Sequence, residues 1–270
     1  MANEGIIKAK AGTVQKSGGK TLRDLINSMQ GEIAKALPSV ITPERFTRIV
    51  LSAVSSNPQL AACTPKSFLA AMMQSAQLGL EVNSPLGQSY LIAYKNHGQD
   101  EVQFQLGYKG LIDLAYRSGE IASIQAQTVY ENDEFHYAYG LEPKLEHIPS
   151  MGDRGEPIAY YAVFKTKDGG YGFEVMSKAD IAAHAQRYSK AYSYSSSPWK
   201  TNFDEMAKKT VLKRVLKYAP LRTDFQRQLT ADETIKTEIN SDMLDVADDT
   251  DVPTVDIEVD NETGEVTVND

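Results

Sequence analysis

The sequence predicts an α+β fold in which an antiparallel sheet built from β-hairpins packs against helices. Apolar residues recur at helical spacing in the first eighty residues and again after Ser177, and they alternate with polar residues in between. Turns rich in Gly, Asn and Asp separate the alternating stretches, as expected between the strands of hairpins. Helices and strands that occur in separate runs are typical of an α+β fold.

Three helices are expected before residue 80. The first begins at Thr21, with the residue pattern of a capping box, and ends before Pro38. The second and third begin at Thr42 and Thr64, because each of these threonines places a capping oxygen just before a proline at the first helical position. Gly79 is expected to end the third helix.

The middle of the chain predicts one antiparallel sheet of about five strands. The strands are expected at residues 88–94, 101–106, 121–130, 158–167 and 171–176. A short helix at 107–119 interrupts the sheet, and the region around Pro143 and Pro149 is expected to be a loop. After the last strand a helix capped by Ser177 is expected, followed by a long basic helix from about Pro198 to Tyr218 on which the sheet packs.

The charge is distributed unevenly along the 270 residues, whose formal net charge is −8. Residues 231–270 hold fourteen acidic residues and one lysine, a net of −13, which leaves +5 for residues 1–230. We therefore expect a disordered arm at 1–20, a core at 21–229 and an acidic, largely disordered tail at 230–270. Within the tail, residues 255–268 alternate around a turn and predict a hairpin that orders against a partner.

Composition favours a cytoplasmic protein. The hydrophobic share of 41% suits a globular core, and no apolar stretch approaches the roughly 20 residues that a membrane span needs. The first twenty residues lack the apolar core of a secretion signal, so we expect no secretion. The single cysteine, Cys63, excludes an internal disulfide and suits a reducing compartment.

No enzymatic signal stands out. The stretch SGGKT at 17–21 resembles the end of a phosphate-binding loop, but Val14 occupies the place of the required glycine, so ATP dependence is not supported. The four histidines lie far apart and form no metal-binding pattern with cysteine or carboxylates. No carboxylate pair indicates metal-assisted nuclease chemistry. We therefore expect no catalytic residue, no metal and no cofactor.

Residues 206–222, MAKKTVLKRVLKYAPLR, contain six Lys or Arg and no acidic residue. On a helix, Lys209, Lys213 and Lys217 form one row at four-residue spacing, with Arg214 beside it. Because apolar residues occupy the opposite arc, we expect that arc to be buried and the row of cations to face phosphate groups. The alternative is an ordinary solvated helix face, which explains most charge runs.

Two further stretches favour nucleic-acid binding. Residues 187–200, RYSKAYSYSSSPWK, interleave cations, which can follow a DNA backbone, with aromatic rings, which can stack on bases. A mobile polar loop with a tryptophan anchor is the alternative. On two predicted strands, the pairs Gln103/Gln105 and Gln125/Gln127 alternate with apolar residues, which gives one face rich in amides. Amides can contact sugars, phosphates and base edges without selecting a sequence.

Three blocks carry a resemblance to a known family. They are QLGLEVNSPLGQSYLIAYKN, QLGYKGLIDLAYRSGEIASIQAQTVYENDEF and WKTNFDEMAKKTVLKRVLKYAP. These blocks resemble the RecT/Redβ family of phage and prophage single-strand annealing recombinases, over about residues 21–222. The resemblance implies a core similar to the annealing domain of eukaryotic recombination mediators. It also implies annealing of complementary DNA without ATP, rings or helical filaments of the chain on DNA, and action beside a phage exonuclease.

The resemblance and the residue patterns together give a set of expected DNA contacts. The expected contacts are Lys95, Gln103, Gln105, Tyr108, Lys109, Gln125, Gln127, Arg187, Tyr188, Lys190, Trp199, Lys200, Lys208, Lys209, Lys213, Arg214 and Lys217. Single-stranded DNA, the annealed duplex, further copies of the chain, a phage exonuclease and a host single-strand DNA-binding protein are the expected partners. Two alternatives stay open: a protective single-strand DNA-binding protein without annealing activity, and an assembly protein whose basic helix docks an acidic partner.

Overall fold

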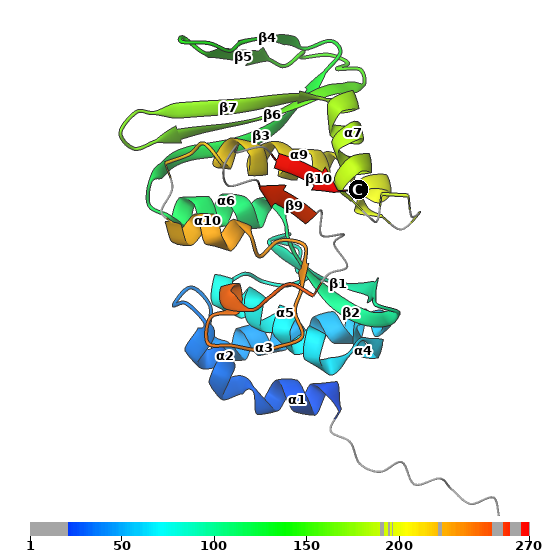
Figure 1. Ribbon diagram of the computed structural model, residues 1–270. Helices are drawn as coiled ribbons and strands as arrows, with labels where there is room; N and C mark the ends of the chain where they lie inside the picture. The colour runs from blue at the N-terminus through cyan, green and yellow to red at the C-terminus, as the bar shows by residue number, and fades with distance from the viewer. Residues whose placement is uncertain are drawn as a thin grey trace, which may run out of the picture.

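A computed structural model of the chain describes residues 21–189, 192, 193, 195, 197–220, 223–249, 256–259 and 266–269 (Figure 1). The arm expected at 1–20 lies outside these residues. The helices are α1 (Leu22–Ser28), α2 (Gln30–Ala36), α3 (Pro43–Ser56), α4 (Pro58–Ala62), α5 (Pro65–Leu78), α6 (Tyr108–Arg117), α7 (Lys178–Tyr188), α8 (Pro198–Thr201), α9 (Phe203–Leu216), α10 (Thr223–Leu229) and the 3-10 helix η1 (Met243–Asp245). The strands are β1 (Ser89–Asn96), β2 (Gln99–Leu106), β3 (Ile121–Tyr130), β4 (Glu134–Ala138), β5 (Lys144–Ile148), β6 (Pro157–Thr166), β7 (Tyr171–Ser177), β8 (Thr234–Ile235), β9 (Asp256–Val259) and β10 (Val266–Asn269).

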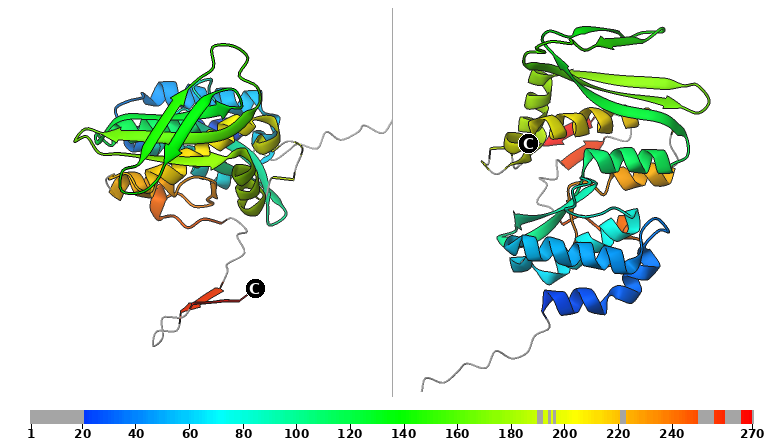
Figure 2. Two further views of the ribbon diagram at one scale, coloured as in Figure 1. Left: turned by 90° about the horizontal axis from the view of Figure 1, so that it is seen from above. Right: turned by 180° about the vertical axis from the view of Figure 1, so that it is seen from behind.

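The mixture of helices with small antiparallel sheets confirms the α+β class. Figures 1 and 2 show the elements stacked along one direction: the N-terminal helices, the β1–β2 hairpin with α5, the helices α6, α9 and α10, and then the sheet of β3, β6 and β7. The β4–β5 hairpin lies beyond that sheet, at the end opposite to α1.

The N-terminal helices begin where their caps predict, with one interruption. Thr21 Oγ1 accepts from the Asp24 N–H at 3.2 Å, and the Asp24 carboxylate accepts from the Thr21 N–H at 3.0 Å, which completes the capping box. The expected single helix up to Pro38 is wrong, because Met29 leaves helical geometry and separates α1 from α2. Just before this break the Ser28 hydroxyl donates to the Leu25 carbonyl at 2.7 Å, a local bond that bends helices.

Gly79 ends α5 in the left-handed conformation, with φ of 60°, as expected. A Cβ at this position would stand 2.4 Å from Cγ of Pro38, so only glycine fits. Thr42 caps α3 through the Arg45 N–H, whereas Thr64 makes no cap bond to α5 and instead shares a hydrogen bond of 2.8 Å with the Ser67 hydroxyl.

The expected single five-stranded sheet is wrong. The strands instead form two separate three-stranded antiparallel sheets, β1–β2–β8 and β3–β6–β7, and a two-stranded β4–β5 hairpin. The two predicted hairpins are both present, but the short helix α6 directs β3 into a different sheet from β2. A sequence pattern fixes which residues lie on one face of a strand but not which distant strand it joins.

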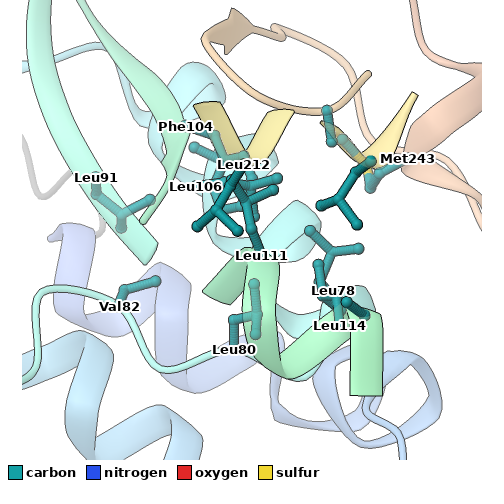
Figure 3. Packing of buried hydrophobic residues seen from close by; sticks show 14 of the residues in the cluster. Leu78, Leu80, Val82, Leu91, Phe104, Leu106, Leu111, Leu114, Leu212 and Met243 are labelled. Carbon is teal, nitrogen blue, oxygen red and sulfur yellow. The ribbon is translucent and has the colours of Figure 1, made fainter. Parts of the chain in front are cut away.

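Helix α9 lies between α6 and the inner face of the β3–β6–β7 sheet, where Val211, Val215 and Leu216 are buried. The expected continuous helix from Pro198 to Tyr218 is broken at Asn202, whose backbone is non-helical, into α8 and α9. Figure 3 shows the centre of the core, where Phe104 and Leu106 of β2, Leu111 of α6 and Leu212 of α9 pack together.

The C-terminal segment 230–249 belongs to the folded body, which corrects the boundary placed after residue 229. Strand β8 pairs with β2 at Phe104↔Thr234 and Gln103↔Ile235, and Met243 is fully buried against α5. Lys236 Nζ donates to the carbonyls of Met243 and Val246, which closes the segment on itself. Further along, β9 and β10 pair antiparallel within the hairpin expected at 255–268.

We predict that a chain ending after residue 229 unfolds at a much lower urea concentration than one ending after residue 249. The shorter chain lacks Asp232, the buried partner of Lys209, and loss of one partner from a buried ion pair costs about 3–5 kcal/mol. Equal unfolding midpoints for the two truncated chains would show that residues 230–249 contribute nothing to the fold.

The β4–β5 hairpin occupies a region expected to be a loop. Most of its residues are exposed, so the apolar alternation that reveals a strand is weak. Phe135 stacks on Tyr161 of β6 with ring centroids 5.6 Å apart, and Tyr139 stacks on Phe173 of β7 at 5.1 Å. The hairpin therefore lies over the outer face of the β3–β6–β7 sheet.

Asp133 fixes the base of this hairpin. Its fully buried carboxylate accepts from the Arg154 guanidinium at 2.6 and 2.9 Å, from the Ser150 and Tyr130 N–H groups at 2.9 Å each, and lies 3.0 Å from His147 Nε2. The Arg154 hydrogen bonds hold the pKa of Asp133 far below its usual range, against the opposing effect of burial.

We predict that Asp133→Asn lowers the melting temperature at pH 7 and that the deficit narrows on acidification. A carboxyl with a lowered folded-state pKa stabilises the fold above its unfolded pKa of about 4 and loses this effect as the pH falls further. Thermal unfolding followed from pH 8 to pH 3 tests this, with the exposed Asp100→Asn as control. A deficit that is unchanged at pH 3 would contradict the role of the Asp133 charge.

Candidate nucleic-acid interface

Two glycines bring the loop before β1 against the first turn of α6. The Gly107 N–H donates to the Gln88 carbonyl at 2.9 Å. A Cβ on Gly107 would stand 2.0 Å from the Gly87 carbonyl oxygen, and one on Gly110 would stand 2.1 Å from that of Gln88. This close approach explains the spacing of the glycines in the sequence GYKG, and it holds Tyr108 and Lys109 at the surface.

Two lysine ammonium groups lie near the ring of Tyr108. Nζ of Lys109 is 6.0 Å and Nζ of Lys208, from α9, is 5.9 Å from the centroid of its ring. Burial, with a further contribution from Glu205, raises the pKa of Tyr108, so its hydroxyl stays neutral. Gly107 gives α6 no side-chain cap, and the positive end of the helix dipole adds to the two lysine charges. An aromatic ring close to cations is typical of surfaces that bind single-stranded nucleic acid.

A pocket of about 250 Å³ opens beside Tyr108, between the β1–β2 hairpin and the α8–α9 turn. It is lined by Tyr90, Ile92, Gln105, Leu106, Gly107, Tyr108, Pro198, Asn202, Glu205, Met206 and Lys209. Of these, only Gln105, Tyr108 and Lys209 were expected at the interface. Tyr90 could have been found from the sequence, because it lies directly opposite Gln105 once the hairpin is aligned.

The two glutamine pairs lie on different sheets. Gln103 and Gln105 lie on the half-exposed face of β2, where Gln105 Nε2 donates to Gln103 Oε1 at 3.0 Å. Gln103 Nε2 in turn donates to the Glu233 carbonyl at 3.2 Å, so this amide also holds the C-terminal segment. Gln125 and Gln127 are exposed on β3 of the other sheet. The alternation predicted from sequence is present in both strands, but only Gln105 lines the pocket.

The outward row of cations predicted on α9 is wrong for Lys209 and holds in part for Lys213. Lys209 is only 4% exposed, and its Nζ donates to Asp232 at 2.9 Å and to Glu233 at 3.1 Å. Lys213 donates to the other oxygen of Asp232 at 2.7 Å, and Lys217 alone of the row is exposed. The row is covered because the C-terminal segment packs on the side of α9 that was expected to face solvent.

The Lys209 ion pair is charged despite its burial. Burial disfavours the ammonium, but Asp232 and Glu233 outweigh it and raise the pKa of Lys209 above its usual value. Burial likewise opposes the charge of Asp232, whose pKa is nevertheless lowered by Lys209 and Lys213. Arg214, beside the row, pairs with Glu174 of β7 at 2.5 Å and is half exposed.

Trp199, which was also predicted to contact DNA, is buried instead. It is 7% exposed and packs edge-on against Phe203 with ring centroids 5.8 Å apart, so it cannot stack on a base. The ring anchors α8, which agrees with the alternative stated for this stretch. Tyr188 is 64% exposed and lies 5.3 Å from the Arg187 guanidinium.

The remaining expected contacts are dispersed. Lys200 lies 4.4 Å from the ring of Tyr192, and Lys95 is exposed near the turn of the β1–β2 hairpin. Lys190 lies outside the described residues. The structure thus brings Gln105, Tyr108, Lys109 and Lys208 together, with Gln103 and the buried Lys209 beside them, and disperses the other expected contacts.

Neither metal nor thiol chemistry finds support in the part of the chain that the structure describes. Within it, no group of three or more His, Cys, Asp or Glu side chains is arranged to hold a metal ion. Burial raises the pKa of the Cys63 thiol to about 11, so it stays protonated at neutral pH. The helices within the described residues include none with the length and apolar character of a membrane span.

Comparison with known proteins gives a family match over most of the chain. A model described as the RecT family matches residues 44–246, which extends beyond the residue-229 boundary in agreement with the folded C-terminal segment. Protein RecT of Escherichia coli (strain K12) is 42% identical over 210 residues, which cover 76% of this chain and 77% of that protein. The uncharacterized protein YqaK of Bacillus subtilis (strain 168) is 30% identical over 248 residues, 91% of this chain and 82% of that protein.

We predict that Lys209→Ala and Lys217→Gln separate stability from surface charge. Lys209→Ala removes one partner of a buried ion pair and lowers the free energy of unfolding by about 3 kcal/mol, whereas Lys217→Gln leaves it nearly unchanged. Urea unfolding measures both. If the Lys209 variant is as stable as the parent, Lys209 does not form a stabilising buried ion pair and instead belongs to the predicted solvent-exposed row.

Proposed function

The chain belongs to the RecT family, and we propose that it anneals complementary DNA strands without nucleotide hydrolysis, as in phage recombination. The observation that carries this proposal beyond the family match is Tyr108 at the first turn of α6, with the ammonium groups of Lys109 and Lys208 about 6 Å from its ring. In the proposal, the two cations neutralise phosphates and the ring stacks on a base.

Annealing by this arrangement needs little from the protein. Two complementary strands repel each other, and lysines that neutralise phosphates lower that repulsion. Phosphate contacts carry no sequence information, so pairing between the strands supplies the specificity. Because base stacking makes the reaction favourable, no hydrolysis is required, which agrees with the lack of a complete phosphate-binding loop at 17–21.

Family membership also supports a set of partners, which we propose together. Copies of the chain form a ring or helical filament on DNA, and many weak contacts then sum along the strand. A phage exonuclease supplies the single strands, and a host single-strand DNA-binding protein precedes this chain on them, in the cytoplasm. The acidic β9–β10 hairpin, joined to the body by only a few residues after Asp249, is the proposed docking element for the exonuclease.

Lys109, which is exposed, and Lys208, which is partly buried, give a direct test of the proposed site. We predict that Lys109→Gln combined with Lys208→Gln folds normally, binds single-stranded DNA more weakly and anneals more slowly. On single strands the slope of log affinity against log salt is about −0.7 per neutralised phosphate, so the double variant should show a slope shallower by about 1.4.

The matched control combines Lys35→Gln with Lys66→Gln, which removes two exposed lysines from the N-terminal helices. Fluorescence anisotropy at several salt concentrations measures binding, and mixing of complementary labelled strands without nucleotide measures annealing. A parental salt slope in the Lys109 and Lys208 variant would refute this site, and a strict requirement for ATP would refute the mechanism.

A further inference from the structure

The pocket beside Tyr108 combines flat and apolar walls with polar groups at one side. Tyr90 and Tyr108 contribute rings, and Ile92 and Met206 contribute apolar surface. Its volume of about 250 Å³ lies below the roughly 300–1,000 Å³ of pockets for drug-sized ligands, so it suits one small flat group.

Three polar side chains supply hydrogen-bonding capacity to this pocket. Gln105 uses one N–H to bind Gln103, and Asn202 uses one N–H to bind the Thr201 hydroxyl at 3.0 Å, so each amide retains further donor and acceptor capacity. Glu205 is half exposed, and its carboxylate lies 4.0 Å from Lys208 Nζ. A carboxylate accepts hydrogen bonds only, so it selects ligands that carry an N–H or O–H donor.

Two cations lie close to the pocket wall that Tyr108 forms. Lys109 and Lys208 are both about 6 Å from the ring centroid of Tyr108, which itself forms part of the pocket wall. A ligand with a flat ring inside and a phosphate outside therefore meets rings, amides and ammonium groups in the matching order. Burial raises the pKa of Tyr90 as well as that of Tyr108, so both hydroxyls remain neutral donors beside Glu205.

We infer that this pocket takes one nucleobase out of the bound single strand and prefers a base with an exocyclic amino group, such as cytosine, to thymine. This inference rests on the proposed function and deepens it. The base stacks against Tyr108 or Tyr90, and its amino group donates to Glu205, which matches the pairing of carboxylates with the cytosine amino group. Thymine offers a carbonyl at that position, which faces the carboxylate without a proton.

A single inserted base per copy of the chain is compatible with annealing. The neighbouring bases stay outside the pocket and remain available to a complementary strand. The inserted base gives each copy a fixed position along the strand, which phosphate contacts alone do not provide.

Binding to three oligonucleotides of equal length tests the inference: oligo-dC, oligo-dT and an abasic strand that keeps the phosphates and lacks the bases. At constant salt, we expect oligo-dC to bind most tightly and the abasic strand to bind most weakly, by roughly five- to a hundredfold relative to oligo-dC. Equal affinity for oligo-dC and the abasic strand, with annealing intact, overturns the pocket and leaves the proposed function standing. Absence of binding to all three overturns both.

Two variants test whether the preference for oligo-dC arises from this pocket. Met206→Phe fills the pocket and should reduce the ratio of oligo-dC to abasic affinity to near one, while Met29→Phe, a matched change in the N-terminal helices, should leave it unchanged. Glu205→Gln should remove the preference for oligo-dC over oligo-dT. A folded Met206 variant that keeps the parental ratio overturns the inference, because the bases would then be contacted elsewhere.

One measurement on the parent protein needs no variant. The only tryptophan, Trp199, stands between the neighbours Pro198 and Lys200 on α8, and Pro198 lines the pocket. Saturable change of its fluorescence with deoxycytidine monophosphate, but not with deoxyribose 5-phosphate, supports base insertion. The same response to both compounds, or to neither, overturns it.

Discussion

The carboxylate of Asp232 is the interaction on which the rest of the structure depends. It is buried between Nζ of Lys209 and Nζ of Lys213, and it also accepts from the Leu106 N–H at 2.8 Å. A buried carboxylate is costly unless it is paired and fully hydrogen-bonded, and here two cations and one amide meet that condition.

The three partners of Asp232 come from α9 and from the end of β2, so one side chain of the C-terminal segment joins elements that are otherwise separate in the sequence. Leu106 lies two residues before Tyr108, and Lys209 follows Lys208 directly. The same ion cluster therefore holds the end of β2, which leads into α6, against α9, and these two helices carry the ring and the ammonium group of the proposed DNA site.

This cluster changes the meaning of the charges in the sequence. Residues 231–249 hold seven acidic residues and one lysine, and residues 250–270 hold seven acidic residues and no basic one. About half of the acidic excess thus lies in a segment that packs on the body, where Asp232 and Glu233 neutralise cations of α9.

The basic run at 206–222 therefore serves two purposes. Lys209 and the partly buried Lys213 hold the fold together through Asp232, whereas in the proposed function Lys208 contacts DNA and Lys217 is exposed. A count of like charges along a helix does not distinguish these purposes, because the acidic partners stand about twenty residues further along the chain.

Sequence reasoning succeeded where local rules decide the structure. The caps at Thr21, Thr42 and Ser177, the left-handed Gly79 and the two main hairpins all follow from patterns within a few residues. The glycines of GYKG were found as part of a motif. They are required because the backbone of residues 87–88 packs against them, and the sequence does not reveal that contact.

Other features could not be predicted. Strand β8 is two residues long and pairs with a strand about 130 residues earlier, so no periodicity could have indicated it. The β4–β5 hairpin was missed because few of its side chains are buried. Trp199 was misplaced for the converse reason: its neighbours are polar, but its own ring is buried in the core.

The proposed DNA site, formed by Tyr108, Lys109 and Lys208, is small, and its size follows from the elements that carry it. The Gly107–Gly110 turn of α6 and the first turns of α9 are both held by buried contacts, so Tyr108, Lys109 and Lys208 are presented by rigid elements. Rigid presentation reduces the entropy lost when a strand binds, but the two lysines of the site neutralise only about two phosphates. In the proposed function, each copy of the chain therefore contributes weak binding, and the strand is held by many copies together. In the proposed function, the small site and the need for assembly both follow from the use of Lys209 and Lys213, two of the four cations of α9, to hold the C-terminal segment.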